Sequence, residues 1–443
     1  MKTTWLAGIL LAAAAVTAVA SEWVAQKPKT EEGRVVVTFW AGWTNFEADA
    51  MREVIKKFNN QQDRITVRFL SVSGISEKTL LSIASGTPPD LALLGSSILP
   101  QYAFENALTP LDEWAAEAGI EKEDYLPVYW ELLNYNDRLW AMAATPATTA
   151  LHYNRAMWEE VGQTEAPKTI EELDALDAKL VKRNGNRVTR AGFLPAEPGW
   201  WPWSWAPYFG GQLLSEDGEI TMMDPNNIRA FEWMQGYTKR YGVSAVQAFR
   251  EGFGGFDSPQ NAFLDGKVSS VLQGVWMANF IEKHRPEMKW DVVPFPHPAD
   301  RPDLANSAVA ELDVMVIPRG AKNAKEAWEF LVFLQSQEAM ELLCLGQRKH
   351  SPLASVSDRF WAEHQNPRVR LFWELASNEN AFSTPWTPIW PAWSAELSAA
   401  IQDINLGKAS VKEALQRVQS RVEPLQREVL ELEAKRRSQE ARP

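Results

Sequence analysis

Residues 34–97 alternate between strand-like and helix-like sequence, and this alternation constrains the fold more than any other feature of the chain. A capping-box pattern at residues 44–47 predicts a helix start, and apolar side chains then recur every four positions. The strand-like runs cover 34–40, 65–69 and 90–94, and a second helix is predicted over 76–85. Three strands separated by two helices form parallel βαβ units, so we expect an α/β fold.

The carboxyl ends of the three expected strands are the predicted place for a ligand, because open α/β sheets bind ligands there. The segments in that position are residues 40–43, 71–73 and 95–97. The first supplies indoles, the other two supply hydroxyls and backbone groups, and the helix that begins at Asn45 directs free N–H groups to the same edge. The candidate binding residues at this edge are Trp40, Trp43, Glu47, Ser73 and Ser96.

Tryptophan is unusually frequent in this chain, with 21 residues against 8 tyrosines, and many of the indoles are grouped. An indole has a broad apolar face and a single N–H donor, which suits a ligand with flat C–H faces and a rim of hydroxyls, such as a sugar. Scattered tryptophans are interpreted as core residues, and for Trp40 and Trp43 core packing and ligand stacking both stay open. The groups lie at residues 40–43, 200–205 and 386–393.

The composition excludes several classes of partner and site. The 443 residues carry a net charge of −12, which disfavours nucleic acid and anionic membranes and fits a ligand without strong charge. Cys344 is the single cysteine, so neither an intrachain disulfide nor a cysteine-based zinc site is possible. We expect no metal, no cofactor and no nucleic-acid partner.

Catalytic signatures are missing from the sequence. There is no phosphate-binding loop, no nucleophile elbow, no zinc-protease motif and no dinucleotide fingerprint, and the five histidines are dispersed. A carboxylate pair of the glycosidase type stays open, because 57 acidic residues make some spatial pair inevitable. We therefore predict no catalytic residue and favour a protein that is not an enzyme.

Residues 1–20 have the features of a cleaved signal peptide. Lys2 precedes an apolar run from Trp5 to Val19, and residues 18–20 form an A-x-A cleavage signal before Ser21. The run is shorter than the roughly 20 residues that a membrane span needs, although an uncleaved anchor is the alternative. No cysteine follows it, which argues against a lipoprotein and for a periplasmic protein. Residues 21–33 are interpreted as a disordered lead-in.

The C-terminal segment has apolar residues at alternating spacings of four and three, which is a heptad seam interrupted by Pro424. We favour a helix that packs on the body of the protein over a coiled coil with a partner, and expect a monomer. Residues 434–443 are interpreted as a frayed tail. The seam consists of Val411, Leu415, Val418, Val422, Leu425, Val429 and Leu432.

An ordered set of short motifs resembles the extracellular solute-binding proteins of sugar ABC importers, the family of maltose- and glycerol-3-phosphate-binding proteins. Each motif is weak alone, but the order is specific and extends over nearly all of residues 35–425. The motifs are Pro88–Leu91, Asn106–Leu111, Leu151–Trp158, Val161–Gly162, Tyr208–Gly211, Ala262–Val268, Gly274–Trp276, Pro294–Pro296, Ala324–Leu334, Ser336–Glu338, Leu406–Ser410 and Glu413–Leu415.

The resemblance implies a two-lobed α/β clamp of periplasmic-binding-protein type II, with a mainly parallel sheet in each lobe and the ligand in the cleft between them. Residues 34–147 and 308–353 would form lobe 1, and residues 148–307 and 354–433 would form lobe 2. The implied function is capture of a mono- or oligosaccharide by hinge closure and delivery to a membrane permease, the implied partner. The alternative is a secreted glycoside hydrolase or lyase with a similar cleft.

The resemblance also implies ligand-binding positions in the two lobes. Arg348 and Lys349 make one segment more basic than is usual in the family, so an acidic or phosphorylated ligand is possible if they face the cleft; otherwise they are solvated charges. Glu311 and Asp313 replace a glycine-rich stretch, and their carboxylates could accept hydrogen bonds from sugar hydroxyls. The further candidates are Trp200, Trp201, Trp203, Trp276, Asp313, Arg348, Trp386 and Trp390.

Overall fold

A computed structural model describes residues 33–255 and 258–440. The predicted signal peptide and nearly all of the lead-in lie outside these ranges. The strands are β1 (Val35–Ala41), β2 (Ile65–Ser71), β3 (Leu91–Gly95), β4 (Asn134–Tyr135), β5 (Arg138–Leu139), β6 (Met142–Asn154), β7 (Lys182–Asn184), β8 (Arg187–Arg190), β9 (Ser270–Gly274), β10 (Trp290–Val293), β11 (Ala308–Val316) and β12 (Ala381–Phe382).

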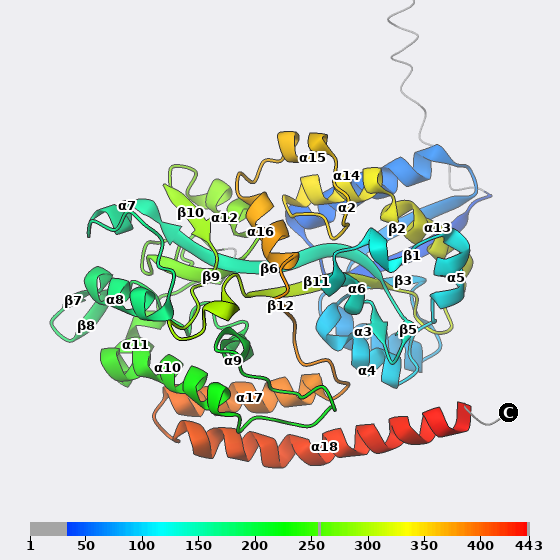
Figure 1. Ribbon diagram of the computed structural model, residues 1–443. Helices are drawn as coiled ribbons and strands as arrows, with labels where there is room; N and C mark the ends of the chain where they lie inside the picture. Colours follow the sequence, from blue (N-terminus) through cyan, green and yellow to red (C-terminus); the bar gives the residue numbers. More distant parts are fainter. Residues whose placement is uncertain (1–32, 256–257, 441–443) are drawn as a thin grey trace, which may run out of the picture.

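Helices flank the strands on both sides of the molecule (Figure 1). The α-helices are α2 (Asn45–Gln61), α3 (Ile75–Ala84), α4 (Leu99–Phe104), α5 (Asp112–Ala118), α6 (Pro127–Glu131), α7 (Arg155–Glu159), α8 (Ile170–Leu180), α9 (Trp205–Tyr208), α10 (Pro225–Tyr241), α11 (Val243–Arg250), α12 (Met277–His284), α13 (Ala324–Gln335), α14 (Gln337–Gln347), α15 (Asp358–Glu363), α16 (Val369–Ala376), α17 (Trp390–Asn405) and α18 (Val411–Glu440). Short 3-10 turns are η1 (Ser96–Ile98), η2 (Lys122–Asp124), η3 (Pro202–Ser204) and η4 (Pro302–Leu304).

The expected βαβ units are present at the start of the described chain. β1 pairs in parallel with both β2 and β3, and α2 and α3 connect these strands. Burial alternates along β1, where Val37, Phe39 and Ala41 are buried and the residues between them are partly exposed. This period of two is the reason that a strand forms here, because it presents one apolar face to the core. The predicted α/β class is confirmed.

Strands β6 and β11 run the length of the molecule and connect its two halves (Figure 1). They pair with each other in antiparallel orientation, and the thirteen-residue β6 continues to pair antiparallel with β9 and β10. The parallel pairing expected in each lobe is therefore found among β1, β2 and β3, whereas β6, β9 and β10 pair antiparallel. The physical reason is that β6 itself extends into the second half and supplies the strand on which β9 and β10 assemble.

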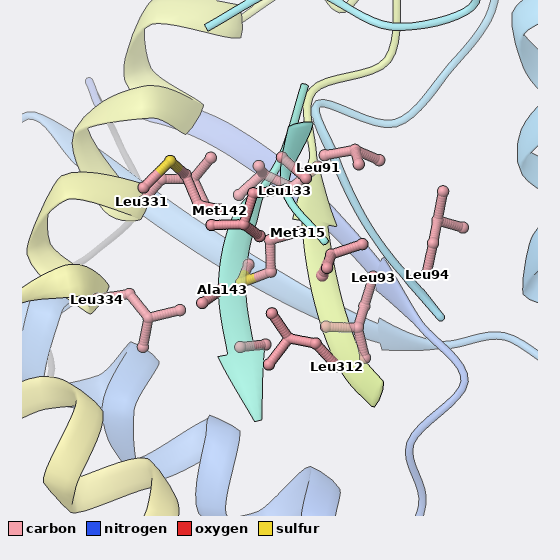
Figure 2. Packing of buried hydrophobic residues seen from close by; sticks show 14 of the residues in the cluster. Leu91, Leu93, Leu94, Leu133, Met142, Ala143, Leu312, Met315, Leu331 and Leu334 are labelled. Atoms are coloured by element: carbon pink, nitrogen blue, oxygen red, sulfur yellow. The ribbon is translucent and has the colours of Figure 1, made fainter. Parts of the chain in front are cut away.

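Two separate hydrophobic cores lie at the two ends of these crossing strands. β6 contributes Ala143 to the first core and Leu151 to the second, and β11 contributes Leu312 to the first and Val309 to the second. Figure 2 shows the first core, in which Met142 and Met315 pack with leucines of β3, β11 and α13. The lobe boundaries predicted from the sequence stay a prediction; Phe360, from the segment assigned to lobe 2, packs in the first core.

Helix α18 contacts both halves of the molecule. Its first part buries apolar seam residues such as Leu415 and Val422 in the second core, as expected for a helix that packs on the body of the protein. Beyond Pro424 the helix continues to Glu440, past the residue at which the frayed tail was expected. There Glu433 accepts hydrogen bonds from Tyr135 and Asn136 of the first half. No helix within 33–255 and 258–440 combines the length and the apolar character needed to cross a membrane.

Candidate functional site

A cavity of about 250 Å³ lies between elements of the two halves. Strand β11 and the turn η1 border it from the first half, and the segment around η3 and helix α17 border it from the second. Its wall combines indoles, hydroxyls and one carboxylate, and no lysine, arginine or histidine of residues 33–255 and 258–440 lines it. The lining residues are Ser97, Trp200, Trp201, Pro202, Trp203, Glu311, Thr384, Trp390, Ser394, Leu397 and Ser398.

The indoles of the wall contact one another. The Trp200 and Trp201 rings meet edge to face at 5.4 Å, and both lie against Trp276, at 6.3 and 5.8 Å between ring centroids. Trp276 lies flat over the backbone of Gly274, where an added Cβ would stand 2.2 Å from the indole. On the other side of the wall, Trp203 meets Trp390 at 5.9 Å. Gly274 thus allows an aromatic surface to form at the end of β9.

A charged cluster surrounds Lys349, directly beyond the end of α14. The Lys349 side chain is only 2% exposed, and its Nζ lies 2.8 Å from Glu47 and 3.6 Å from Asp313. Asp313 also accepts a hydrogen bond of 3.3 Å from the indole of Trp43. The Lys349 ammonium lies 5.8 and 5.9 Å from the rings of Trp43 and Trp276. This cluster therefore joins Glu47 of α2 and Asp313 of β11 with Trp276, which follows β9, and Lys349, which follows α14.

The charges of this cluster shift its pKa values. Burial by itself would lower the pKa of Lys349, but the charges of Glu47 and Asp313 outweigh burial and raise it, so the ammonium form is maintained. Burial raises the pKa of Asp313 to about 6, although the charge of Lys349 opposes the shift. The lysine and its two carboxylate neighbours form a closed arrangement in which the cation is satisfied by the protein itself.

Glu311 is also buried but has no cation beside it among the described residues; the Trp201 side chain forms a hydrogen bond with this carboxyl, which by itself lowers its pKa. Its Oε1 is buried and has no hydrogen-bond partner among residues 33–255 and 258–440. Burial, followed by the charge of Asp313, raises the pKa of Glu311 to about 7. Thr384 Oγ1, in the same cavity wall, is also buried and lacks a partner among the described residues. Two polar atoms of the cavity wall are therefore available to a bound molecule.

The two halves meet beside the cavity. Phe46 of α2 packs against Phe280 of α12 at 6.1 Å, and Asn279 donates to the carbonyl of Gln347. Arg348, which follows Gln347, forms an ion pair with Glu282 of α12. These contacts join α2 and α14 of the first half to α12 of the second.

The structure brings nine of the sequence-predicted site residues to the cavity or to the Lys349 cluster. Trp200, which is 38% exposed, belongs to this set together with two deeply buried indoles, Trp203 and Trp390. Their role in binding stays a prediction. The set is Trp43, Glu47, Trp200, Trp201, Trp203, Trp276, Asp313, Trp390 and, from the acids named beside Asp313, Glu311.

The other predicted site residues have different surroundings. Ser96 is buried and accepts a hydrogen bond from the backbone N–H of Leu312, which fixes β11 against η1. Trp386 donates its indole N–H to the carbonyl of Asn134. Ser73 is exposed, Trp40 is half-buried on the face of β1 opposite Phe39, and Arg348 is held by Glu282.

Several lining residues were not predicted. Ser97 follows Ser96 and lines the cavity, whereas Thr384, Ser394 and Ser398 come from the region around α17. Trp390, Ser394 and Ser398 recur every four residues, a spacing that places them on one face of a helix. This periodicity was the signal available in the sequence. Among the described residues, no group of three or more histidine, cysteine or acidic side chains could hold a metal ion.

Comparisons with known proteins relate the chain to one family. The sequence profile described as "Bacterial extracellular solute-binding protein" matches residues 44–341. A putative binding protein from Brucella abortus (strain 2308) is 23% identical over 415 residues, which cover 91% of this chain and 94% of that protein. The diacetylchitobiose binding protein DasA from Streptomyces coelicolor is 21% identical over 309 residues, which cover 67% of this chain and 68% of that protein.

Solved structures share the fold. CpMnBP1 with mannotriose bound has a TM-score of 0.77 and 22% identity, with 87% of this chain and 99% of that chain covered. UgpB from Mycobacterium tuberculosis in complex with glycerophosphocholine has a TM-score of 0.72 and 17% identity, with 91% and 100% covered. At these identities the likeness supports the two-lobed fold, which agrees with the two cores and the crossing strands.

Proposed function

Because the chain belongs to the bacterial extracellular solute-binding protein family, we propose that it is the substrate-binding component of an ABC importer. In this proposal it captures a carbohydrate in the cavity between the lobes and delivers it to a membrane permease. The observation that carries the proposal is the composition of the cavity wall, in which four indoles stand beside hydroxyls and a carboxylate. Indole faces pack on the C–H faces of sugar rings, and the polar groups bind the hydroxyl rim.

The ligands of similar proteins support a saccharide ligand for this chain. DasA is described as a diacetylchitobiose binding protein, and CpMnBP1 is described with mannotriose and with mannobiose bound. A cavity of about 250 Å³ is slightly below the roughly 300–1,000 Å³ of drug-sized ligand pockets, which favours a mono- or disaccharide over a long chain.

The basic segment at residues 348–349 left the possibility of an acidic ligand open. The partners of the charged residues disfavour such a ligand. Lys349 forms ion pairs with Glu47 and Asp313, and Arg348 forms an ion pair with Glu282. A uronic acid or a phosphorylated sugar would meet Glu311 in the cavity without a free cation beside it, and the repulsion would weaken binding. We therefore propose a ligand without negative charge.

The remaining parts of the proposal concern location and assembly. The family is extracellular, and we propose a periplasmic monomer that is exported by its N-terminal signal and is not a lipoprotein. β6 and β11 provide the connection on which the lobes would hinge during closure. The proposed partner is the permease, which would receive the sugar from the closed form. We propose binding without catalysis.

Tryptophan fluorescence tests the proposal, because several indoles line the cavity. The mature protein is titrated with neutral mono- and disaccharides, among them glucose, mannose, galactose, mannobiose and diacetylchitobiose, together with the 2-amino analogues of the monosaccharides. Saturable quenching by a saccharide that mass spectrometry recovers unchanged is the expected result. Recovery of shortened or altered sugars would instead support the carbohydrate-active enzyme, and the absence of saturable binding across all saccharides would contradict a sugar-binding role.

A further inference from the structure

We propose that the preferred saccharide carries a protonated amine and that the carboxylate of Glu311 is the counter-ion of this amine. The inference rests on the proposed function and narrows its ligand to a cationic amino sugar. It is argued from the unpartnered atoms of the cavity wall, from the charge of that wall and from the position of its indoles.

The unpartnered carboxylate oxygen is the first observation. The Trp201 side chain forms a hydrogen bond with the carboxyl of Glu311, but a buried carboxylate also needs a proton or a cation to offset its charge. Glu311 Oε1 is buried in the cavity wall and has no hydrogen-bond partner within the two described ranges. A bound ammonium group would supply both donors and positive charge, and hydrogen bonds between ionised groups are roughly twice as strong as neutral ones.

The charge of the surroundings is the second observation. Within the described part of the chain no lysine, arginine or histidine lines the cavity, and Lys349 already contacts two other carboxylates, Glu47 and Asp313. The burial and the neighbouring acid that raise the pKa of Glu311 are unfavourable for the ionised carboxylate alone. The same burial and the same neighbouring acid favour the binding of a cation, because a positive charge is attracted by Glu311 and by the negative charge of Asp313.

The indoles are the third observation. A cation within about 6 Å of an indole face is attracted by the negative charge of the ring. Trp200, Trp201, Trp203 and Trp390 all border the same cavity as Glu311. An ammonium group opposite Glu311 would thus lie among aromatic rings, and the sugar ring that carries it would pack on their faces. Thr384, whose buried Oγ1 has no partner in the described part of the chain, can bind a hydroxyl of the same ring.

Matched ligand pairs test the inference in the wild-type protein. The pairs are glucose and glucosamine, mannose and mannosamine, galactose and galactosamine, and diacetylchitobiose and its fully deacetylated disaccharide. Dissociation constants are measured at pH 6.5, where the amines are protonated. We expect the amine of the pair that binds most strongly to bind at least about tenfold more tightly than its neutral partner.

The substitution Glu311→Gln identifies the residue responsible. It keeps the shape of the side chain and removes its charge, so the preference for the amine should fall to within about threefold. The control Glu232→Gln removes the same charge from an exposed position on α10 and should leave the preference unchanged. Circular dichroism and binding of the neutral partner check that the Glu311 variant is folded.

The outcomes separate the inference from the proposed function. If a neutral saccharide binds as tightly as its amine or more tightly, the inference is overturned and the sugar-binding function stands. If the amine preference survives Glu311→Gln, Glu311 is not the counter-ion and the inference is overturned as well. If neither member of any pair binds and the neutral panel also fails, the proposed function fails together with the inference.

Discussion

Glu311 and Asp313 stand two residues apart on β11, yet their surroundings differ in one respect. Both carboxyls have pKa values raised by burial, to about 7 and about 6. Asp313 has the Lys349 ammonium and the Trp43 indole as partners, whereas Glu311 Oε1 has no partner in residues 33–255 and 258–440. The protein stabilises one buried acid internally and leaves the other to the cavity.

This difference separates a structural use of buried charge from a ligand-binding use. Lys349, which follows α14, pairs with Glu47 of α2 and Asp313 of β11, so the cluster holds these elements together. The Oε1 atom of Glu311 instead lacks a hydrogen-bond partner among the described residues, which lowers the free energy of unfolding. Loss of the charge at Lys349 should therefore lower the free energy of unfolding, whereas loss of the charge at Glu311 should raise it at neutral pH.

The largest effect is expected for Lys349→Met. The variant removes the buried cation and leaves Glu47 and Asp313, whose side chains are 25% and 28% exposed, without their shared partner, which should cost about 3–5 kcal/mol. The free energy of unfolding is measured with urea at pH 7.5. Lys57→Met is the control, because its ion pair with Glu338 is exposed on the acid side and should contribute at most about 1 kcal/mol. Equal losses in the two variants would show that the Lys349 cluster contributes no more to stability than an exposed ion pair does.

The second effect is a dependence of stability on pH that Glu311→Gln should remove. The pKa of Glu311 is about 7 in the folded protein, above its usual 4.5, so the folded state holds the proton more strongly than the unfolded state. Stability therefore falls as the pH rises from about 4.5 to about 8, by about 3 kcal/mol for this group. Unfolding free energies of both proteins across this range give the difference, and parallel curves would contradict the shift.

The third effect concerns the aromatic wall on the Glu311 side. In Gly274→Ala the new Cβ would stand 2.2 Å from the Trp276 indole, so the ring must move. This movement should lower the free energy of unfolding by about 1–3 kcal/mol. Loss of sugar affinity should accompany the shift, because Trp276 supports Trp200 and Trp201. Gly236→Ala in α10 is the control: nothing lies within 4 Å of its added Cβ, so stability should stay the same or rise by up to about 1 kcal/mol.

The smallest effect is expected far from both acids. Tyr135→Phe removes the hydrogen bond that Tyr135 donates to Glu433 and should cost about 1 kcal/mol. The pH difference between wild type and Glu311→Gln should persist in this background, since the sites share no partner. Unfolding of the double variant measures this additivity, and a changed pH difference would show that the cavity and α18 are coupled.

The sequence predicted the α/β class and several residues that the fold brings to one cavity, but not which of two neighbouring side chains lies there. Strand and helix periods are readable because each repeats over several residues. One turn of backbone at the end of an element decides which of two neighbouring side chains lies at the cavity or in the Lys349 cluster. This holds for Ser96 and Ser97 after β3 and for Arg348 and Lys349 after α14. Ser96 turns inward to Leu312 and Ser97 lines the cavity; Arg348 reaches Glu282 and Lys349 reaches Asp313.

The pairing of Asp313 could not be predicted either, because it depends on contacts between distant segments. Lys349 and Glu47 are 302 positions apart in the sequence and meet only when α14 packs on α2. Trp386 is a second example of a contact between distant segments. Its residue type and its proline-rich surroundings suggested a ligand contact, and in the structure its indole N–H donates to the carbonyl of Asn134. Residue type indicates what a side chain can do, and the fold determines its partner.

Helix α18 gives the clamp a mechanical property of its own. It is fixed to the second core at Leu415 and Val422 and to the first half at Glu433, so it works as a tie rod between the two jaws. Any motion that separates the jaws along this rod must bend it or detach its far end. Pro424 lies between the two attachments, where a helix resists bending least. The stiffness of one helix thus sets part of the work of opening, and with it the rate at which cargo can leave.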